Sequence, residues 1–149
     1  MKRFTSTYEN KVDKKGRVSV PASFRAVLDD QGNGIFYLKR NADEGAIDGL
    51  TEAFMDDVQE RIDALPVGSV ERDMAEDEYF ANSVEMRCDP DGRIILSKAL
   101  MDMAGITDAA LFVGKGRNRF QIWSPATYKG RSERRAAEHG PVVLARPGS

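Results

Sequence analysis

Cysteine and histidine are almost absent from this chain, which has one of each among its 149 residues. The single cysteine, Cys88, excludes an intrachain disulfide and any zinc site built from several thiolates. The single histidine, His139, opens a C-terminal stretch rich in proline and glycine, so no Ser-His or Cys-His pair is expected with both members in ordered structure. The many carboxylates could serve acid/base or metal chemistry, but their spacing favours a solvent-exposed helix face. The sequence therefore predicts no catalytic residue, no metal site, no cofactor and no small-molecule substrate, and a protein that is not an enzyme.

Long apolar runs are also missing. No stretch approaches the roughly 18 consecutive apolar residues that a membrane-spanning helix requires. The first five residues are not followed by the apolar segment of a signal peptide. Hydrophobic residues make up 41% of the chain and charged residues 31%, as in ordinary globular domains. We therefore expect a cytoplasmic protein without a membrane partner.

Charge of both signs is abundant, but it is segregated along the chain. Residues 1–40 carry nine Lys/Arg against four Asp/Glu, and residues 87–149 carry eleven against six. Residues 41–86 between them carry two against fourteen, so the small net charge of −2 conceals two basic segments and one acidic segment. The overall pI of about 5.5 would by itself argue against nucleic-acid binding, but the segregation into basic and acidic segments is compatible with it.

One motif occurs twice. Residues 12–21 read VDKKGRVSVP, and residues 88–97 read CDPDGRIILS at an offset of 76. The same offset carries a later apolar pair onto another, because Ile35 corresponds to Leu111 and its neighbour Phe36 to Phe112. An offset that holds across an intervening loop indicates a duplicated unit.

Each copy of the unit predicts the same order of elements. A strand, a turn containing Asp and Gly, and a second strand predict a hairpin, which is followed by a short helix and two further strands. In the first copy we expect strands at 4–11, 17–20, 35–38 and 46–50, and the helix at 22–28. In the second copy we expect strands at 84–88, 93–96, 111–114 and 119–123, and the helix at 98–104.

The segment between the two units predicts a pair of helices, at 52–65 and 70–81, that present their carboxylates to solvent. We expect an α+β fold in which the two units pair about a pseudo-twofold axis and form a small β-barrel with helices outside it. The expected division is a first unit (3–50), an acidic two-helix insert (51–82), a second unit (83–125), a C-terminal helix (126–138) and a flexible tail (139–149).

The repeated hairpin holds the candidate functional residues. Asp13 and Gly16, like Asp89 and Gly92, suit the turn itself, because Asp caps a turn and Gly accepts a positive φ. Arg17 and Arg93 are not needed by the turn. Each could be a surface arginine or a salt-bridge partner of the nearby Asp, but their recurrence in equivalent places favours a shared function. Together with Lys14 and Lys15 they would form a basic ridge that suits phosphates and guanine edges.

These motifs resemble the MraZ family, built from two AbrB-type swapped-hairpin units. The resemblance rests on residues 12–25 and 88–96, with further matches at 111–115 and 120–123, and it covers about residues 3–128. It implies a nucleoid-associated transcription regulator that binds direct repeats in the promoter region of the division and cell-wall operon. It also implies a closed ring of subunits with the hairpin Arg and Lys residues (Lys14, Lys15, Arg17 and Arg93) facing double-stranded DNA. Pro90-Asp91 replaces the lysine pair in the second hairpin, so the two hairpins are expected to contribute unequally.

Two other hypotheses remain open at this point. The chain could be a ring-forming oligomeric interaction module without specific DNA readout, because an acidic insert and basic units offer complementary faces. A small hydrolase or nucleotide-binding enzyme is the third hypothesis, and the sequence gives it almost no support.

Overall fold

The computed structural model describes residues 2–148. The strands are β1 (Thr7–Lys11), β2 (Arg17–Ser19), β3 (Phe36–Asn41), β4 (Ala46–Thr51), β5 (Ser83–Met86), β6 (Arg93–Ile95), β7 (Ala109–Gly114) and β8 (Arg119–Trp123). The α-helices are α1 (Ala22–Asp30), α2 (Glu52–Asp63), α3 (Val70–Glu76), α4 (Lys98–Ala104) and α5 (Pro125–His139), and a π-helical turn, η1, covers Asp77–Ala81. The predicted α+β class is confirmed.

Strand pairing is exchanged between the two halves of the chain. The main antiparallel sheet has the order β1-β7-β8-β4-β3-β5, and β2 pairs with β6 in a separate ladder. Strand β1 therefore pairs with β7 of the second half, and β5 pairs with β3 of the first half. The prediction of a local hairpin is wrong in its strand pairing. The turn after β1 forms, but β1 pairs with β7 rather than with β2.

The expected small β-barrel is not closed by the ladders of residues 2–148. Strands β1 and β5 are the two edges of an open sheet. Strands β2 and β6 do not pair with these edge strands. They pair with each other instead, so the sheet stays open. Backbone hydrogen bonds at both ends of this ladder, from Val20 N–H to the Gly92 carbonyl (2.9 Å) and from Leu96 N–H to the Gly16 carbonyl (2.8 Å), complete their pairing.

Five phenylalanines from both halves meet at the centre of the core. The ring of Phe120 lies 5.1 to 6.2 Å, centroid to centroid, from the rings of Phe4, Phe24, Phe36 and Phe112. All five side chains are buried. Helix α1 supplies Phe24 to this cluster, and the inward side chains of the β2–β6 ladder, Val18 and Ile94, belong to the same core. The ladder is therefore fixed to the core by its inner face.

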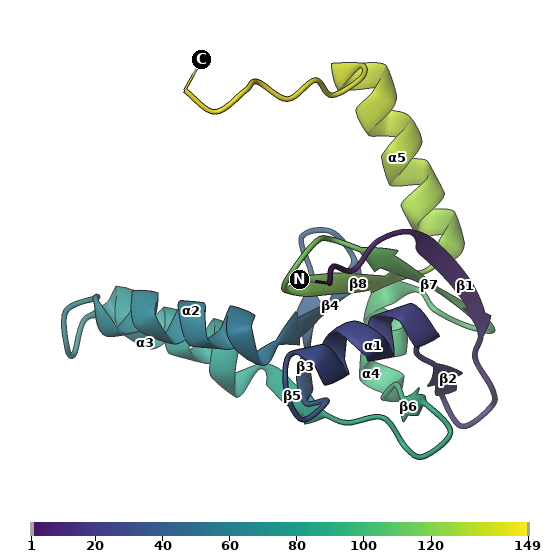
Figure 1. The fold of residues 1–149 in the computed structure, drawn as a ribbon, viewed down its shortest axis with the longest axis horizontal. Coiled ribbons are helices and arrows are strands. Elements are labelled where there is room, and N and C mark those ends of the chain that lie inside the picture. The colour runs from purple at the N-terminus through teal and green to yellow at the C-terminus, as the bar shows by residue number, and fades with distance from the viewer. Residues whose placement is uncertain (1, 149) are drawn as a thin grey trace.

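An acidic helical arm projects from the sheet. Figure 1 shows α2 and α3 side by side, pointing away from the side of the molecule that carries β2. The Thr51 side chain caps α2 by accepting from Phe54 N–H (3.2 Å). The predicted helix 70–81 is an α-helix only to Glu76 and continues as η1. At this joint the buried Lys39 ammonium contacts Glu78 at 2.7 Å, and this ion pair ties the base of the arm to β3.

Helix α5 leads the chain away from the sheet in a second direction (Figure 1). Its first turns are held by Arg131, whose guanidinium lies 4.5 Å from the centroid of the Trp123 ring and 3.5 Å from a carboxylate oxygen of Glu44. Residues 140–148 contain neither helix nor strand. The predicted C-terminal helix is thus confirmed, and it begins at Pro125.

Candidate nucleic-acid interface

The first loop, residues 13–17, is organised by one carboxylate. Asp13 Oδ1 accepts from the backbone N–H groups of Lys15 and Arg17, both at 2.9 Å. Its Oδ2 accepts from Nε of the Arg17 guanidinium at 2.7 Å. The N–H of Gly16 donates to the Asp13 carbonyl at 3.0 Å, and Gly16 has a φ of +83°. The loop therefore fixes both the backbone and the side chain of Arg17.

The second loop, residues 89–93, repeats this arrangement with one difference. Asp89 Oδ1 accepts from the N–H groups of Asp91 and Arg93 at 2.9 Å, and its Oδ2 accepts from Arg93 Nε at 3.3 Å. Arg93 also donates through Nη2 to a carboxylate oxygen of Asp91 at 3.2 Å. The Arg93 guanidinium is therefore flanked by two carboxylates, whereas Arg17 has one.

Both anchoring carboxylates are ionised at neutral pH. The hydrogen bond from the Arg17 backbone N–H, reinforced by the Arg17 guanidinium, holds the pKa of Asp13 below its usual value. The hydrogen bond from the Arg93 backbone N–H likewise lowers the pKa of Asp89. Formal charges differ between the loops: residues 13–17 contain three basic side chains and one acidic one, and residues 89–93 contain one basic and two acidic. Positive charge is thus concentrated in the first loop.

The β2–β6 ladder brings the two loops together. In its register Arg17 is opposite Ile95, and Ser19 is opposite Arg93. Side chains alternate along a strand, so the buried Val18 and Ile94 point inward and the flanking residues point outward. We call these four, Arg17, Ser19, Arg93 and Ile95, the outer ladder face. The sequence placed Arg17 and Arg93 on hairpins but did not show that they share one surface.

Two residues near this surface were missed by the sequence reasoning. Ile95 is exposed on the outer ladder face. Strand alternation places Ser19 on the same face as Arg17, and Ile95 corresponds to Ser19 at the repeat offset of 76. The sequence therefore contained a signal that Ile95 lies on this face. Arg25 of α1 donates from Nε to the Val20 carbonyl (3.2 Å) and packs against Gly92, where a Cβ would lie 2.7 Å from the guanidinium carbon. Nothing in the sequence indicated that contact.

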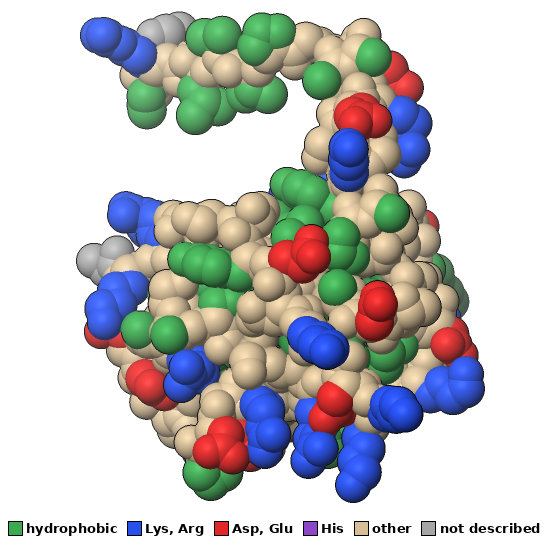
Figure 2. Space-filling view, turned by 90° about the vertical axis from the view of Figure 1, so that its right-hand side faces the viewer, with side chains coloured by type: hydrophobic (Ala, Val, Ile, Leu, Met, Phe, Trp, Pro, Cys, Tyr) green, Lys and Arg blue, Asp and Glu red, His purple; other side chains and the backbone are tan. Residues whose placement is uncertain are grey.

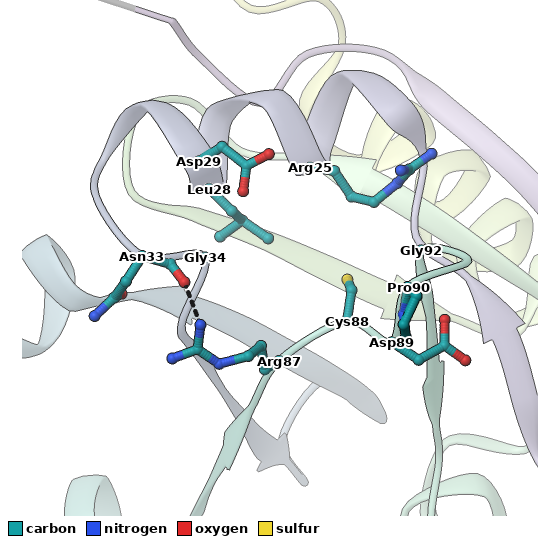
Figure 3. Close-up of a pocket in the computed structure, with 10 residues that line it drawn as sticks. All are labelled: Arg25, Leu28, Asp29, Asn33, Gly34, Arg87, Cys88, Asp89, Pro90 and Gly92. Atoms are coloured by element: carbon teal, nitrogen blue, oxygen red, sulfur yellow. Dashed lines mark hydrogen bonds between the residues drawn. The ribbon is translucent and has the colours of Figure 1, made fainter.

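A cavity of about 280 Å³ lies behind the second loop (Figure 3). Arg25, Asp29 and Arg87 line it with the thiol of Cys88. Burial raises the pKa of this thiol, which is therefore protonated at neutral pH and a poor nucleophile. Arg87 is engaged with the Asn33 carbonyl at 2.7 Å. The cavity is therefore bounded on one side by the second loop and on the other by α1, which supplies Arg25 and Asp29.

The surface around the two loops is rich in positive charge. Figure 2 shows Lys and Arg side chains gathered over the lower part of the face that carries β2, with Asp and Glu side chains between them.

Within residues 2–148 no His, Cys, Asp and Glu side chains form a group of three that could hold a metal ion. No helix in that part of the chain is long and apolar enough to cross a membrane.

Comparison with known proteins identifies relatives over most of the chain. The profile of the family described as "MraZ protein, putative antitoxin-like" matches residues 79–139. A protein of Parvibaculum lavamentivorans is 44% identical over 129 residues, which cover 86% of this chain and 80% of the relative. A protein of Rhodospirillum rubrum is 39% identical over 151 residues, covering 94% and 93%. One of Pelagibacter ubique is 40% identical over 127 residues, covering 85% and 81%. All three are named "Transcriptional regulator MraZ".

Proposed function

The chain belongs to the MraZ family, and we propose on that basis that it is a transcriptional regulator that binds double-stranded DNA. Its named relatives are regulators rather than enzymes. We further propose that its target is a set of direct repeats in the promoter region of the division and cell-wall operon, so that it acts in the cytoplasm at the nucleoid. We interpret the exchanged pairing of β1 and β5 as the AbrB-type swapped-hairpin arrangement of two units, residues 3–50 and 83–125.

The observation that carries this proposal is the pair of Asp-anchored arginines on the outer ladder face. The guanidinium side chains of Arg17 and Arg93 are 38% and 36% exposed, and each is bound at Nε by its own aspartate. A side chain that is already held loses less conformational entropy on binding. The planar guanidinium can use its Nη groups on a phosphate or on the O6 and N7 of guanine.

The proposed binding mode places the β2–β6 ladder in the major groove. A two-stranded β-ribbon fits that groove. Lys14 and Lys15 extend from the first loop and would meet phosphates at the groove edge. The second loop, in which Asp91 engages Arg93, would bind more weakly. One ladder would therefore hold the DNA mainly at one end.

Replacement of Arg17 by alanine is expected to weaken binding to a duplex that carries the proposed promoter repeats by about tenfold or more, because a charge-assisted hydrogen bond is lost. Lys14→Ala/Lys15→Ala should lower the slope of log affinity against log salt concentration by about 1.8, the value for two phosphate contacts. Fluorescence anisotropy titrations at several salt concentrations measure both effects.

Arg61→Ala is the matched control for Arg17→Ala. Arg61 lies on the acidic arm with its side chain 80% exposed, and its removal changes the net charge by the same amount. We expect Arg61→Ala to bind the duplex as the unmodified protein does. Equal affinities of Arg17→Ala and Arg61→Ala would remove Arg17 from the proposed interface.

We also propose that copies of the chain assemble head to tail into a closed ring, with the acidic arm of one copy against the basic α5 of the next. Residues 52–81 contain ten acidic and two basic side chains, and residues 125–139 contain four Lys/Arg and two Glu. The arm also exposes the apolar side chains of Val67, Val70 and Met74. Contact between two different surfaces of one chain forms a ring when its rotation closes.

Light scattering coupled to size exclusion should give a mass several times 16.5 kDa. Val70→Asp/Met74→Asp should shift the population towards the monomer, because the substitutions add charge to the apolar part of the arm. Val84→Asp, at an exposed valine outside the arm, is the control and should leave the mass unchanged. A monomer at every protein concentration would contradict the ring and would leave the DNA-binding proposal to its own test.

A further inference from the structure

The outer ladder face contains one apolar side chain that folding does not explain. Ile95 is 61% exposed, whereas its neighbours Ile94 and Leu96 are 3% and 2% exposed and belong to the core. The repeat gives a direct comparison, since the residue that corresponds to Ile95 in the first unit is the polar Ser19. A polar side chain at this position is therefore compatible with the ladder, and isoleucine at Ile95 is not required for it.

Two differences between the repeated units occur at the same end of the ladder: the first loop carries a lysine pair that the second loop lacks, and Ile95 stands where the first unit has Ser19. Ile95 is the cross-strand partner of Arg17, the last residue of the basic first loop. Directly after it, the N–H of Leu96 donates to the Gly16 carbonyl at 2.8 Å, which fixes β6 against that loop. At the other end Ser19 is opposite Arg93, whose guanidinium is flanked by two carboxylates. We call the first loop with Ile95 the basic end, and the second loop with Ser19 the opposite end.

An aliphatic side chain opposite a guanidinium, at the end of the ladder that adjoins the loop with two lysines, matches one chemical feature of DNA. The major groove presents hydrogen-bonding groups on all four base pairs, and its apolar feature is the C5-methyl group of thymine. Phosphates bound by the lysines would fix the register, and an apolar contact to a base edge would then add sequence information. The alternative occupant is the acidic arm of a second copy, which exposes Val67, Val70 and Met74. In the proposed ring that arm contacts α5 of the next copy, which leaves the outer ladder face free for DNA.

We propose that Ile95 is a specificity-determining residue that contacts the C5-methyl of a thymine in the major groove while the first loop holds the adjacent phosphates. This inference rests on the proposed DNA-binding function. Its consequence is directional: the basic end reads an apolar base edge and the opposite end presents a hydroxyl, so a single ladder distinguishes the two orientations of its site. Copies of such a ladder that follow one another head to tail, as in the proposed ring, would read their sites as direct repeats, whereas a single symmetric ladder would favour a palindromic site.

The test is a scan in which each thymine of the bound duplex is replaced, one at a time, by deoxyuridine, which lacks only the C5-methyl group. We expect the unmodified protein to lose about fourfold in affinity at one thymine per site, the value for one buried methyl-sized group. Ile95→Ala should lose a similar factor on the thymine duplex and should no longer distinguish thymine from uracil at that position. Such non-additivity is the mark of a direct contact.

Two controls keep the outcomes separate. Ser19→Ala, at the equivalent position of the opposite end, should retain the thymine preference, and Ile95→Thr keeps the β-branched shape that the strand favours if Ile95→Ala is poorly folded. A thymine preference that survives both Ile95 variants would overturn the inference while DNA binding stands. If the Ile95 variants change the mass of the assembly but not the thymine preference, Ile95 belongs to a contact between copies, and the inference is overturned as well. Failure of the unmodified protein to bind any duplex would overturn the proposed function itself.

Discussion

Phe120→Ala is expected to lower the free energy of unfolding by about 3–5 kcal/mol, the range for a fully buried aromatic side chain. The Phe120 ring is the common neighbour of four other phenylalanine rings that come from both halves of the chain. Its removal leaves a cavity that these rings cannot fill, because they are held on different elements. Urea unfolding followed by circular dichroism measures the loss.

The residue opposite Phe120 on β4 makes this expectation sharper. A Cβ at Gly49 would lie 2.4 Å from the Phe120 ring, so Gly49→Ala alone should destabilise the protein by overpacking. In the Phe120→Ala background the same methyl group enters vacated space, and its cost should fall or change sign. Additive losses in the double variant would contradict direct packing of the ring on Gly49. Phe80→Ala, at a partly exposed ring in η1, is the control and should cost less than Phe120→Ala.

Gly16→Ala is expected to lower the free energy of unfolding by about 2–4 kcal/mol and to abolish most DNA binding. The residue has a φ of +83°, and an added Cβ would lie 2.5 Å from the Leu96 carbonyl oxygen. A side chain in this conformation costs about 1–3 kcal/mol, and the displaced backbone would also lose the Leu96 N–H to Gly16 carbonyl bond, worth about 1 kcal/mol. The displacement would separate the first loop from β6.

Gly45→Ala separates these two causes. Gly45 also has a positive φ, of +72°, but an added Cβ meets nothing within 4 Å. It should therefore show the conformational cost alone, about 1 kcal/mol, with DNA binding intact. Urea unfolding and anisotropy titrations on both variants provide the comparison. Equal losses of stability in Gly16→Ala and Gly45→Ala would show that the contact with the Leu96 carbonyl does not contribute to the cost of Gly16→Ala.

The repeat made much of the fold predictable. Strands β2 and β6 begin at Arg17 and Arg93, and helices α1 and α4 begin at Ala22 and Lys98, so the offset of 76 holds in three dimensions. Strand partners were not predictable in the same way. Strand β1 has a close neighbour in sequence, β2, and a local hairpin was the natural expectation, yet an alternating pattern does not specify which strand will pair with it. The pairing with β7 is decided by the joint core of both halves.

Prediction of the candidate site was limited by the same cause. The spacing of Asp13 and Arg17 is visible in the sequence, and so is its repetition at Asp89 and Arg93. That the two loops adjoin opposite ends of one ladder depends on the register of β2 against β6, which no local pattern contains. The continuous apolar run of Ile94, Ile95 and Leu96 also hid the exposure of its middle residue. The π-helical turn η1 escaped prediction because its apolar spacing resembles that of an α-helix.

The exchange of β1 and β5 has a consequence for synthesis on the ribosome. Strand β1 ends at Lys11 and its partner β7 begins at Ala109, so β1 emerges about 100 residues before the strand that completes its hydrogen bonds. At translation rates of about 5–20 residues per second, this delay is about 5–20 seconds. During that interval the nascent first half exposes both an unsatisfied strand and its share of the phenylalanine cluster. The side chains of β1 are mostly polar and remain largely exposed in the folded protein. They are therefore compatible with a strand that stays solvated and unpaired until β7 has been synthesised.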